Sequence, residues 1–181
     1  MKLIIFEAAI YALVPLVWFL FKRFAGRNVA GEMIAGAIIG FFNEFATEPL
    51  WDYHFRLTYY KDIPVAIILS WGVLFAVVVY VSEKMYCFAR KRKTIKPGDV
   101  SIFIFDLLAA ALIAFPVETL GVKSGIWTYR YDRLNWDWGT VPLFNMPWEA
   151  LFGYCLLMLI GPSFVRAWEK TFDEVLPGEG E

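Results

Sequence analysis

Long apolar runs, separated by short polar segments, are the dominant pattern along this chain. Five runs are close to the ~20 residues that a helix needs to cross ~30 Å of hydrocarbon. The predicted helices extend from Leu3 to Phe21, Gly31 to Trp51, Ile63 to Tyr80, Val100 to Leu120 and Pro147 to Val165. The pattern predicts an all-α integral membrane protein, a bundle of about five transmembrane helices. Residues 1–172 form one predicted domain, and residues 173–181 form a polar tail.

Composition agrees with this class of protein. Hydrophobic residues make up 59% of the chain and the mean hydropathy is +0.53, whereas soluble domains are nearer 45–50% apolar. The net charge of −1 gives no field that would attract nucleic acid. We therefore expect hydrophobic partners: an isoprenoid or other lipid substrate, membrane lipids and a second copy of the chain.

Basic residues between the runs predict the orientation in the membrane. Eleven lysines and arginines lie on one side, against six on the other. The larger group is Lys22, Arg23, Arg27, Lys84, Arg90, Lys91, Arg92, Lys93, Lys96, Arg166 and Lys170. Since cytoplasmic loops carry the excess of Lys and Arg, we expect an outside amino terminus and a cytoplasmic carboxyl terminus.

A weak repeat links two parts of the chain. Trp51-Asp52-Tyr53 is followed by Ile63-Pro64 and then Trp71, while Trp127-Thr128-Tyr129 is followed by Val141-Pro142 and then Trp148. Two helical hairpins with the same punctuation indicate a duplication. A chance match in a Trp-rich chain is the alternative.

Carboxylates inside the apolar runs are the main candidates for chemistry. The second run has Glu32, Gly36, Gly40, Glu44 and Glu48 at steps of four, and the fourth has Asp106, Ala110, Ala114 and Glu118. Steps of four form one helical stripe, and charge within hydrocarbon is costly enough to indicate function. Our catalytic candidates are Glu118, Glu44, Glu48 and Glu149. Anchoring of helix ends by snorkelling side chains is the alternative.

Aromatic residues surround these carboxylates in the sequence. The candidates for substrate binding are Trp51, Tyr53, Trp127, Tyr129, Trp148 and the amide of Asn43. Trp and Tyr also gather in belts at membrane interfaces, where they have no catalytic role. Both interpretations stay open for Trp51 and Trp127.

Metal and cofactor chemistry find little support in the sequence. The chain has one histidine, His54, and two cysteines, Cys87 and Cys155, so it lacks the His and Cys clusters of common metal sites. We expect no cofactor.

The segment from Glu118 to Tyr154 resembles a family of membrane proteins of carotenoid biosynthesis. It reads ETLGVKSGIWTYRYDRLNWDWGTVPLFNMPWEALFGY and is similar to the bisanhydrobacterioruberin and carotenoid hydratase type. The shared positions are Glu118, Leu120, Gly121, Val122, Ser124, Gly125, Tyr129, Tyr131, Val141, Pro142, Leu143, Pro147 and Trp148. Pro147-Trp148-Glu149 also resembles the Pro-x-Glu motif of the small, heterodimeric-type membrane lycopene cyclases, which consist of two related helical halves. These enzymes are longer or carry a second acid where this chain has Ala150.

The resemblance implies acid-initiated hydration (a lyase) or cyclisation (an isomerase) of a polyene without a cofactor. A carboxylic acid in an apolar site can deliver a proton to a carbon–carbon double bond, and aromatic faces stabilise the cation that forms. We rank Glu118 first as the acid, with Glu44 and Glu48 as a pair sharing a proton. We expect Glu118 and Glu149 in one cavity, and close packing of Gly36 and Gly40 on the fourth and fifth helices. A non-catalytic subunit or a small carrier of ions or lipids is the alternative.

Overall fold

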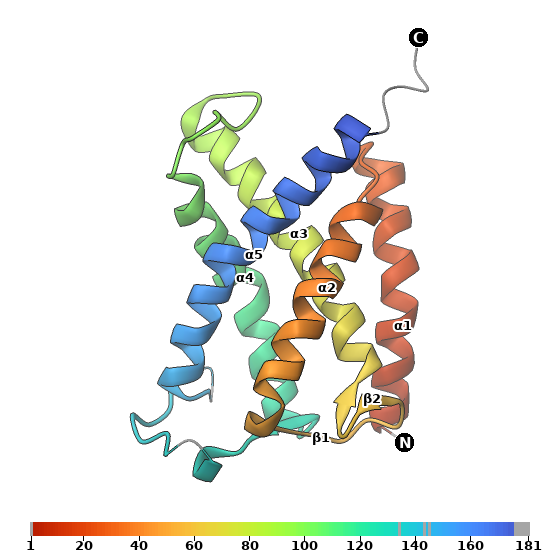
Figure 1. The fold of residues 1–181 in the computed structure, drawn as a ribbon, viewed down its shortest axis with the longest axis vertical. Helices are drawn as coiled ribbons and strands as arrows, with labels where there is room; N and C mark the ends of the chain where they lie inside the picture. Colours follow the sequence, from red (N-terminus) through yellow and green to blue (C-terminus); the bar gives the residue numbers. More distant parts are fainter. Residues whose placement is uncertain (1, 134, 143, 145, 176–181) are drawn as a thin grey trace.

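Five long helices form the fold of this computed structural model, which describes residues 2–133, 135–142, 144 and 146–175. They are α1 (Lys2–Leu20), α2 (Ala30–Thr47), α3 (Val65–Arg90), α4 (Ile102–Lys123) and α5 (Trp148–Val175). Figure 1 shows them side by side as one bundle. The bundle is that of an all-α membrane protein, as predicted.

Four of the five helices are long and apolar enough to cross a membrane, namely α3, α4, α5 and α1 with the π-helical turn Phe21–Ala25 that continues it. The remaining helix, α2, has 18 residues and two buried carboxylates, Glu32 and Glu44. It packs against α3 and α5, so its polar side chains are covered by protein.

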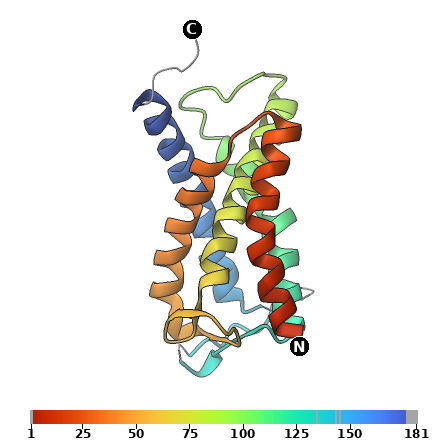
Figure 2. The ribbon, with the colours of Figure 1, turned by 90° about the vertical axis from the view of Figure 1, so that its right-hand side faces the viewer.

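Short strands cover one end of the bundle, which we call the strand end (Figure 1). They are β1 (Trp51–Tyr53), β2 (Thr58–Tyr60), β3 (Ile63–Pro64) and β4 (Trp127–Tyr129). Strand β1 pairs with β4, and β2 pairs with β3, both antiparallel. The opposite end, which we call the loop end, carries the α3–α4 connection. Figure 2 shows α1 beside α3 at the edge of the bundle.

Three helices end well before or well after the residues that the hydropathy pattern predicts. The second helix was predicted to reach Trp51, but α2 ends at Thr47 and a 3₁₀ turn, Glu48–Leu50, follows. Pro49 explains this early end, because it has no backbone N–H to continue the helix. The third and fifth helices continue as far as Arg90 and Val175, since a polar segment can prolong a helix outside the hydrocarbon.

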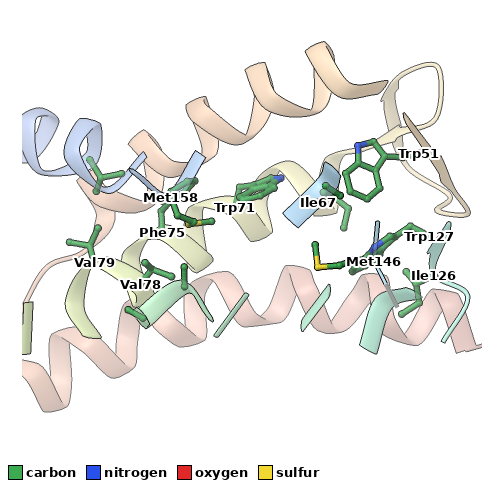
Figure 3. Packing of buried hydrophobic residues seen from close by; sticks show 14 of the residues in the cluster. Trp51, Ile67, Trp71, Phe75, Val78, Val79, Ile126, Trp127, Met146 and Met158 are labelled. Atoms are coloured by element: carbon green, nitrogen blue, oxygen red, sulfur yellow. The ribbon is translucent and has the colours of Figure 1, made fainter. Parts of the chain in front are cut away.

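The core lies along the bundle axis, where rings from the strand end meet aliphatic side chains from α3 and α5 (Figure 3). Glycines allow α2 to approach α3 closely: a Cβ on Gly36 would lie 2.8 Å from the Cβ of Phe75, and one on Gly40 would lie 2.3 Å from the Cβ of Trp71. The predicted contacts of the fifth helix with the second and the fourth are present, but the prediction that Gly36 and Gly40 make the contacts to the fourth and fifth helices is wrong. The glycine stripe packs on α3.

Candidate functional site

The pairing of β1 with β4 organises the strand end. Trp51 lies opposite Tyr129, and Tyr53 lies opposite Trp127. Because two Trp-x-Tyr segments run antiparallel, a local twofold axis passes between Asp52 and its partner across the ladder. The ring centroids of Trp51 and Tyr129 are 4.5 Å apart, and those of Tyr53 and Trp127 are 6.3 Å apart.

Glu44 of α2 is buried, with 1% of its surface exposed. One carboxylate oxygen accepts a hydrogen bond from Trp71 Nε1 at 2.7 Å, and the other accepts one from the hydroxyl of Tyr53, also at 2.7 Å. Both donors are aromatic side chains. The carboxylate is therefore satisfied without a basic residue beside it.

Glu118 of α4 has a matching environment and is 4% exposed. Its Oε1 accepts from Trp127 Nε1 at 2.9 Å and from the Tyr129 hydroxyl at 2.7 Å. Its Oε2 accepts from the Tyr154 hydroxyl at 2.7 Å. Glu118 thus has three aromatic donors, one more than Glu44.

These contacts correct the register of the predicted repeat. Trp71 follows Pro64 by seven residues and Tyr154 follows Pro147 by seven, and each donates to the carboxylate of its own half. Helices α3 and α5 both begin directly after these prolines. Met146-Pro147, rather than Val141-Pro142, is therefore the counterpart of Ile63-Pro64.

The two halves, α2–β1–α3 and α4–β4–α5, have the same order of elements and meet at the β1–β4 pair. The rings of Trp71 and Tyr154, one from each half, stack with centroids 6.0 Å apart and an interplanar angle of 28°. In keeping with the axis, α2 contacts α5 and α3 contacts α4. The duplication of a helical hairpin stays a prediction, with which these contacts are consistent.

Both buried glutamates line one cavity of about 50 Å³, which we call the carboxylate cavity. Its aromatic wall is formed by Tyr53, Trp71, Trp127 and Tyr154. The rest of the lining is mostly apolar. The structure therefore places two carboxylates from different helices against the same small space.

A second cavity of about 130 Å³ lies between α2 and α5, which we call the α2–α5 cavity. Three predicted site residues line it: Asn43, Trp51 and Glu149. The expectation that Glu149 shares a cavity with Glu118 is wrong, because Trp71 and Tyr154 form a wall common to both cavities.

Two other predicted residues lie apart from these cavities. Glu48 accepts a hydrogen bond from Lys61 Nζ at 2.7 Å, in an ion pair. Glu44 has aromatic partners instead, so the structure gives no contact in support of a proton shared between Glu44 and Glu48. Trp148 is 36% exposed at the start of α5 and lines neither cavity.

Strand pairing is secured at its outer surface by Arg130. Its guanidinium forms ion pairs with Asp52 and Asp62, the latter at 3.2 Å. The hydrogen bond from Arg130 lowers the pKa of the Asp52 carboxyl. This link joins the end of β4 to the loop of the first half, and so holds both Trp-x-Tyr segments in register.

Charged side chains form a separate network toward the loop end. Arg166 of α5 binds both carboxylate oxygens of Asp106, at 2.9 and 2.5 Å, and donates to Ser82 at 2.7 Å. Glu83 connects Arg166 to Arg27, and Arg27 also pairs with the buried Glu32. Glu32 and Asp106, the carboxylates of the two stripes that lie toward the loop end, thus each have an arginine partner, unlike Glu44 and Glu118.

Trp71 and Tyr154 are the residues that sequence reasoning did not assign to the site. Equal spacing from Pro64 and Pro147 was the available signal, but the Val-Pro pair at 141–142 concealed it. Within the described ranges, no three His, Cys, Asp or Glu side chains come together as a group that could hold a metal ion.

No protein-family model matches the chain, and no curated protein or solved structure matches it. The class of protein therefore follows from the fold and the site: an all-α membrane bundle with two buried carboxylates from different helices lining one cavity.

Proposed function

We propose that this protein catalyses the acid-initiated modification, by hydration or cyclisation, of a polyene or other isoprenoid lipid within the membrane, without a cofactor. The observation that carries this proposal is that Glu44 and Glu118 line one cavity with aromatic walls. The resemblance of residues 118–154 to carotenoid hydratases and cyclases is consistent with it.

The chemistry needs a proton donor, a stabilised cation and a proton acceptor. A carboxylic acid adds its proton to one carbon of a double bond, and the other carbon becomes a carbocation. In cyclisation a second double bond attacks this cation, and a carboxylate then removes a proton. In hydration, water adds to the cation and loses a proton, so the product is heavier by one water.

Hydrogen-bond donors support different roles for the two glutamates. Three donors surround Glu118 and two surround Glu44. Because hydrogen-bond donors stabilise a carboxylate, the extra donor makes Glu118 the better stabiliser of a cation. On this difference we assign Glu44 as the acid, although the sequence ranks Glu118 first.

Aromatic rings support the cationic intermediate. Trp and Tyr faces attract cations by about 0.5–2 kcal/mol, most strongly where water is excluded. The wall that Trp71 and Tyr154 form together places two rings beside the cavity.

We also propose an orientation for the protein in the membrane. The strand end lies outside, and the loop end, which carries more basic residues, is cytoplasmic.

The test uses purified protein in liposomes with an acyclic C40 polyene. Hydration should add the mass of one water, and cyclisation should shift the absorbance without a change of mass. Glu44→Gln and Glu118→Gln should each lower turnover by about 100-fold or more, the usual contribution of acid–base catalysis. Glu48→Gln, which removes a carboxylate outside the cavity, should retain the wild-type rate. Full activity of both Gln variants at the cavity, or no conversion of the polyene, would overturn the proposal.

A carrier of protons or cations is the second candidate, because two carboxylates facing one intramembrane cavity also suit a relay. In this case the liposomes should show an ion flux that depends on Glu44 and Glu118, with no change in any polyene.

A further inference from the structure

The α2–α5 cavity lies on the other side of the Trp71–Tyr154 wall from the carboxylate cavity. The repeat relates part of the two linings. Leu74 and Leu157 are counterparts, because each follows its donor, Trp71 or Tyr154, by three residues. The differences between the corresponding positions are therefore informative.

The α2–α5 cavity is the larger of the two, and its lining has smaller residues at two corresponding positions. Ile67 and Ser70 in the carboxylate cavity correspond to Ala150 and Gly153 here. Removing this side-chain volume agrees with the change from about 50 to about 130 Å³. The larger cavity can hold a group bigger than a single water.

Two polar residues that line the α2–α5 cavity have apolar counterparts in the other half of the chain. Asn43 stands one residue before Glu44, where the second half has Val117 before Glu118. Glu149 likewise corresponds to Ala66. The α2–α5 cavity thus has an amide where the carboxylate cavity has Val117, and a carboxylate, Glu149, whose counterpart Ala66 is apolar.

One carboxylate oxygen of Glu149 lacks a hydrogen-bond donor among the described residues. Its Oε1 accepts the backbone N–H of Trp138 at 3.0 Å. Its Oε2 is buried and has no hydrogen-bond partner among the described residues. An unpaired buried acceptor is costly, so a group that binds in this cavity and donates one hydrogen bond would be stabilised.

We propose that the α2–α5 cavity binds the hydroxyl group of an isoprenoid alcohol. The hydroxyl donates to Glu149 Oε2 and accepts from the Asn43 amide, while the hydrocarbon chain lies along Leu50 and Leu157. A neutral hydroxyl suits this mostly apolar site better than an ammonium group, whose desolvation costs far more. Water is the other source of a hydroxyl in the cavity. The inference rests on the proposed function and names an alcohol as the substrate or product, which corresponds to hydration.

The experiment compares geranylgeraniol, a C20 isoprenoid alcohol, with the hydrocarbon that lacks its hydroxyl. Binding to the full chain in nanodiscs is measured by tryptophan fluorescence, since Trp51, Trp71 and Trp136 line the cavity. The wild-type protein should bind the alcohol about tenfold more tightly, the equivalent of one hydrogen bond. Glu149→Leu and Asn43→Val should each remove this preference while still binding the hydrocarbon.

A cavity-filling variant provides the control for folding and location. A Cβ added at Gly153 would meet no atom within 4 Å, so Gly153→Leu should fold normally and weaken binding of both compounds. Equal affinity of wild-type protein for the two compounds, with an ordered water at Glu149 Oε2 in a high-resolution map, would assign the hydroxyl to water. Equal affinity without such a water would overturn the inference.

Binding and turnover fail independently in this design. A preference for the alcohol without any polyene conversion would refute the proposed function and leave the hydroxyl site standing. Conversion of the polyene with equal affinity for the alcohol and the hydrocarbon, and with no ordered water at Glu149 Oε2, would refute the hydroxyl site and leave the proposed function standing.

Discussion

Gly40 gives the sharpest test of the packing that positions Glu44. A Cβ at this residue would lie 2.3, 2.5 and 2.6 Å from the Cβ, Cγ and Cδ1 atoms of Trp71, well inside the ~3.5–4.0 Å of an unstrained carbon contact. In Gly40→Ala the indole must therefore move. Its movement should break the 2.7 Å hydrogen bond from Trp71 Nε1 to Glu44.

Two contributions add up in this variant. Overpacking of a core costs about 1–3 kcal/mol, and a hydrogen bond between neutral groups is worth about 0.5–1.5 kcal/mol. We expect the free energy of unfolding to fall by about 1.5–4.5 kcal/mol, measured by reversible denaturant titration in mixed micelles.

Gly31→Ala is the matched control for Gly40→Ala, because it lies in the same helix and its Cβ would meet no atom within 4 Å. It carries the same gain in helix propensity, which opposes the loss. Equal stability of the two variants would refute the close approach of α2 to Trp71.

Two further predictions concern charged groups toward the loop end. Hydrogen bonds from Ser101 and Tyr86 lower the pKa of Asp99 to about 2, so Asp99 stabilises the fold above its unfolded pKa of about 3.9. This contribution is lost as the pH falls toward 2, and Asp99→Asn should lower the melting temperature at pH 7 but not at pH 2. Arg166→Leu leaves the fully buried Asp106 without its bidentate partner and should cost about 3–5 kcal/mol. Adding Asp106→Leu should restore much of this loss, and denaturant titration of both variants checks it.

Helices and carboxylates could be predicted from the sequence because both are local signals. Apolar runs defined four spanning helices and α2, and the stripes at steps of four placed Glu44 and Glu118 on faces covered by protein. The aromatic partners Tyr53, Trp127 and Tyr129 were named for the same reason, since they follow these helices directly.

Long-range pairing could not be predicted. Strands β1 and β4 have three residues each, too few for a periodic pattern, and their partners are far apart in the chain. The site depends on this pairing, because it brings the two halves together around one axis. Glu149 was placed at the wrong cavity because sequence proximity to Trp148 gave no information about which side of the axis α5 presents.

The repeat itself makes a prediction that no single contact makes. Trp71 packs over Gly40, four residues before Glu44, whereas Tyr154 has Ala114 at the corresponding place, four residues before Glu118. If the halves are equivalent, Tyr154→Trp should clash with the Ala114 methyl group and lose about 1–3 kcal/mol of stability. Adding Ala114→Gly should then restore stability by rebuilding the Trp71–Gly40 contact in the second half, with the indole N–H donating to Glu118. Ala114→Gly alone is the control, and it should be destabilising by about 1 kcal/mol because glycine weakens a helix. Denaturant titration of the three variants measures the coupling between the two positions. Purely additive effects would mean that Tyr154 and Trp71 do not occupy equivalent positions, and the twofold relation would then be limited to the strands.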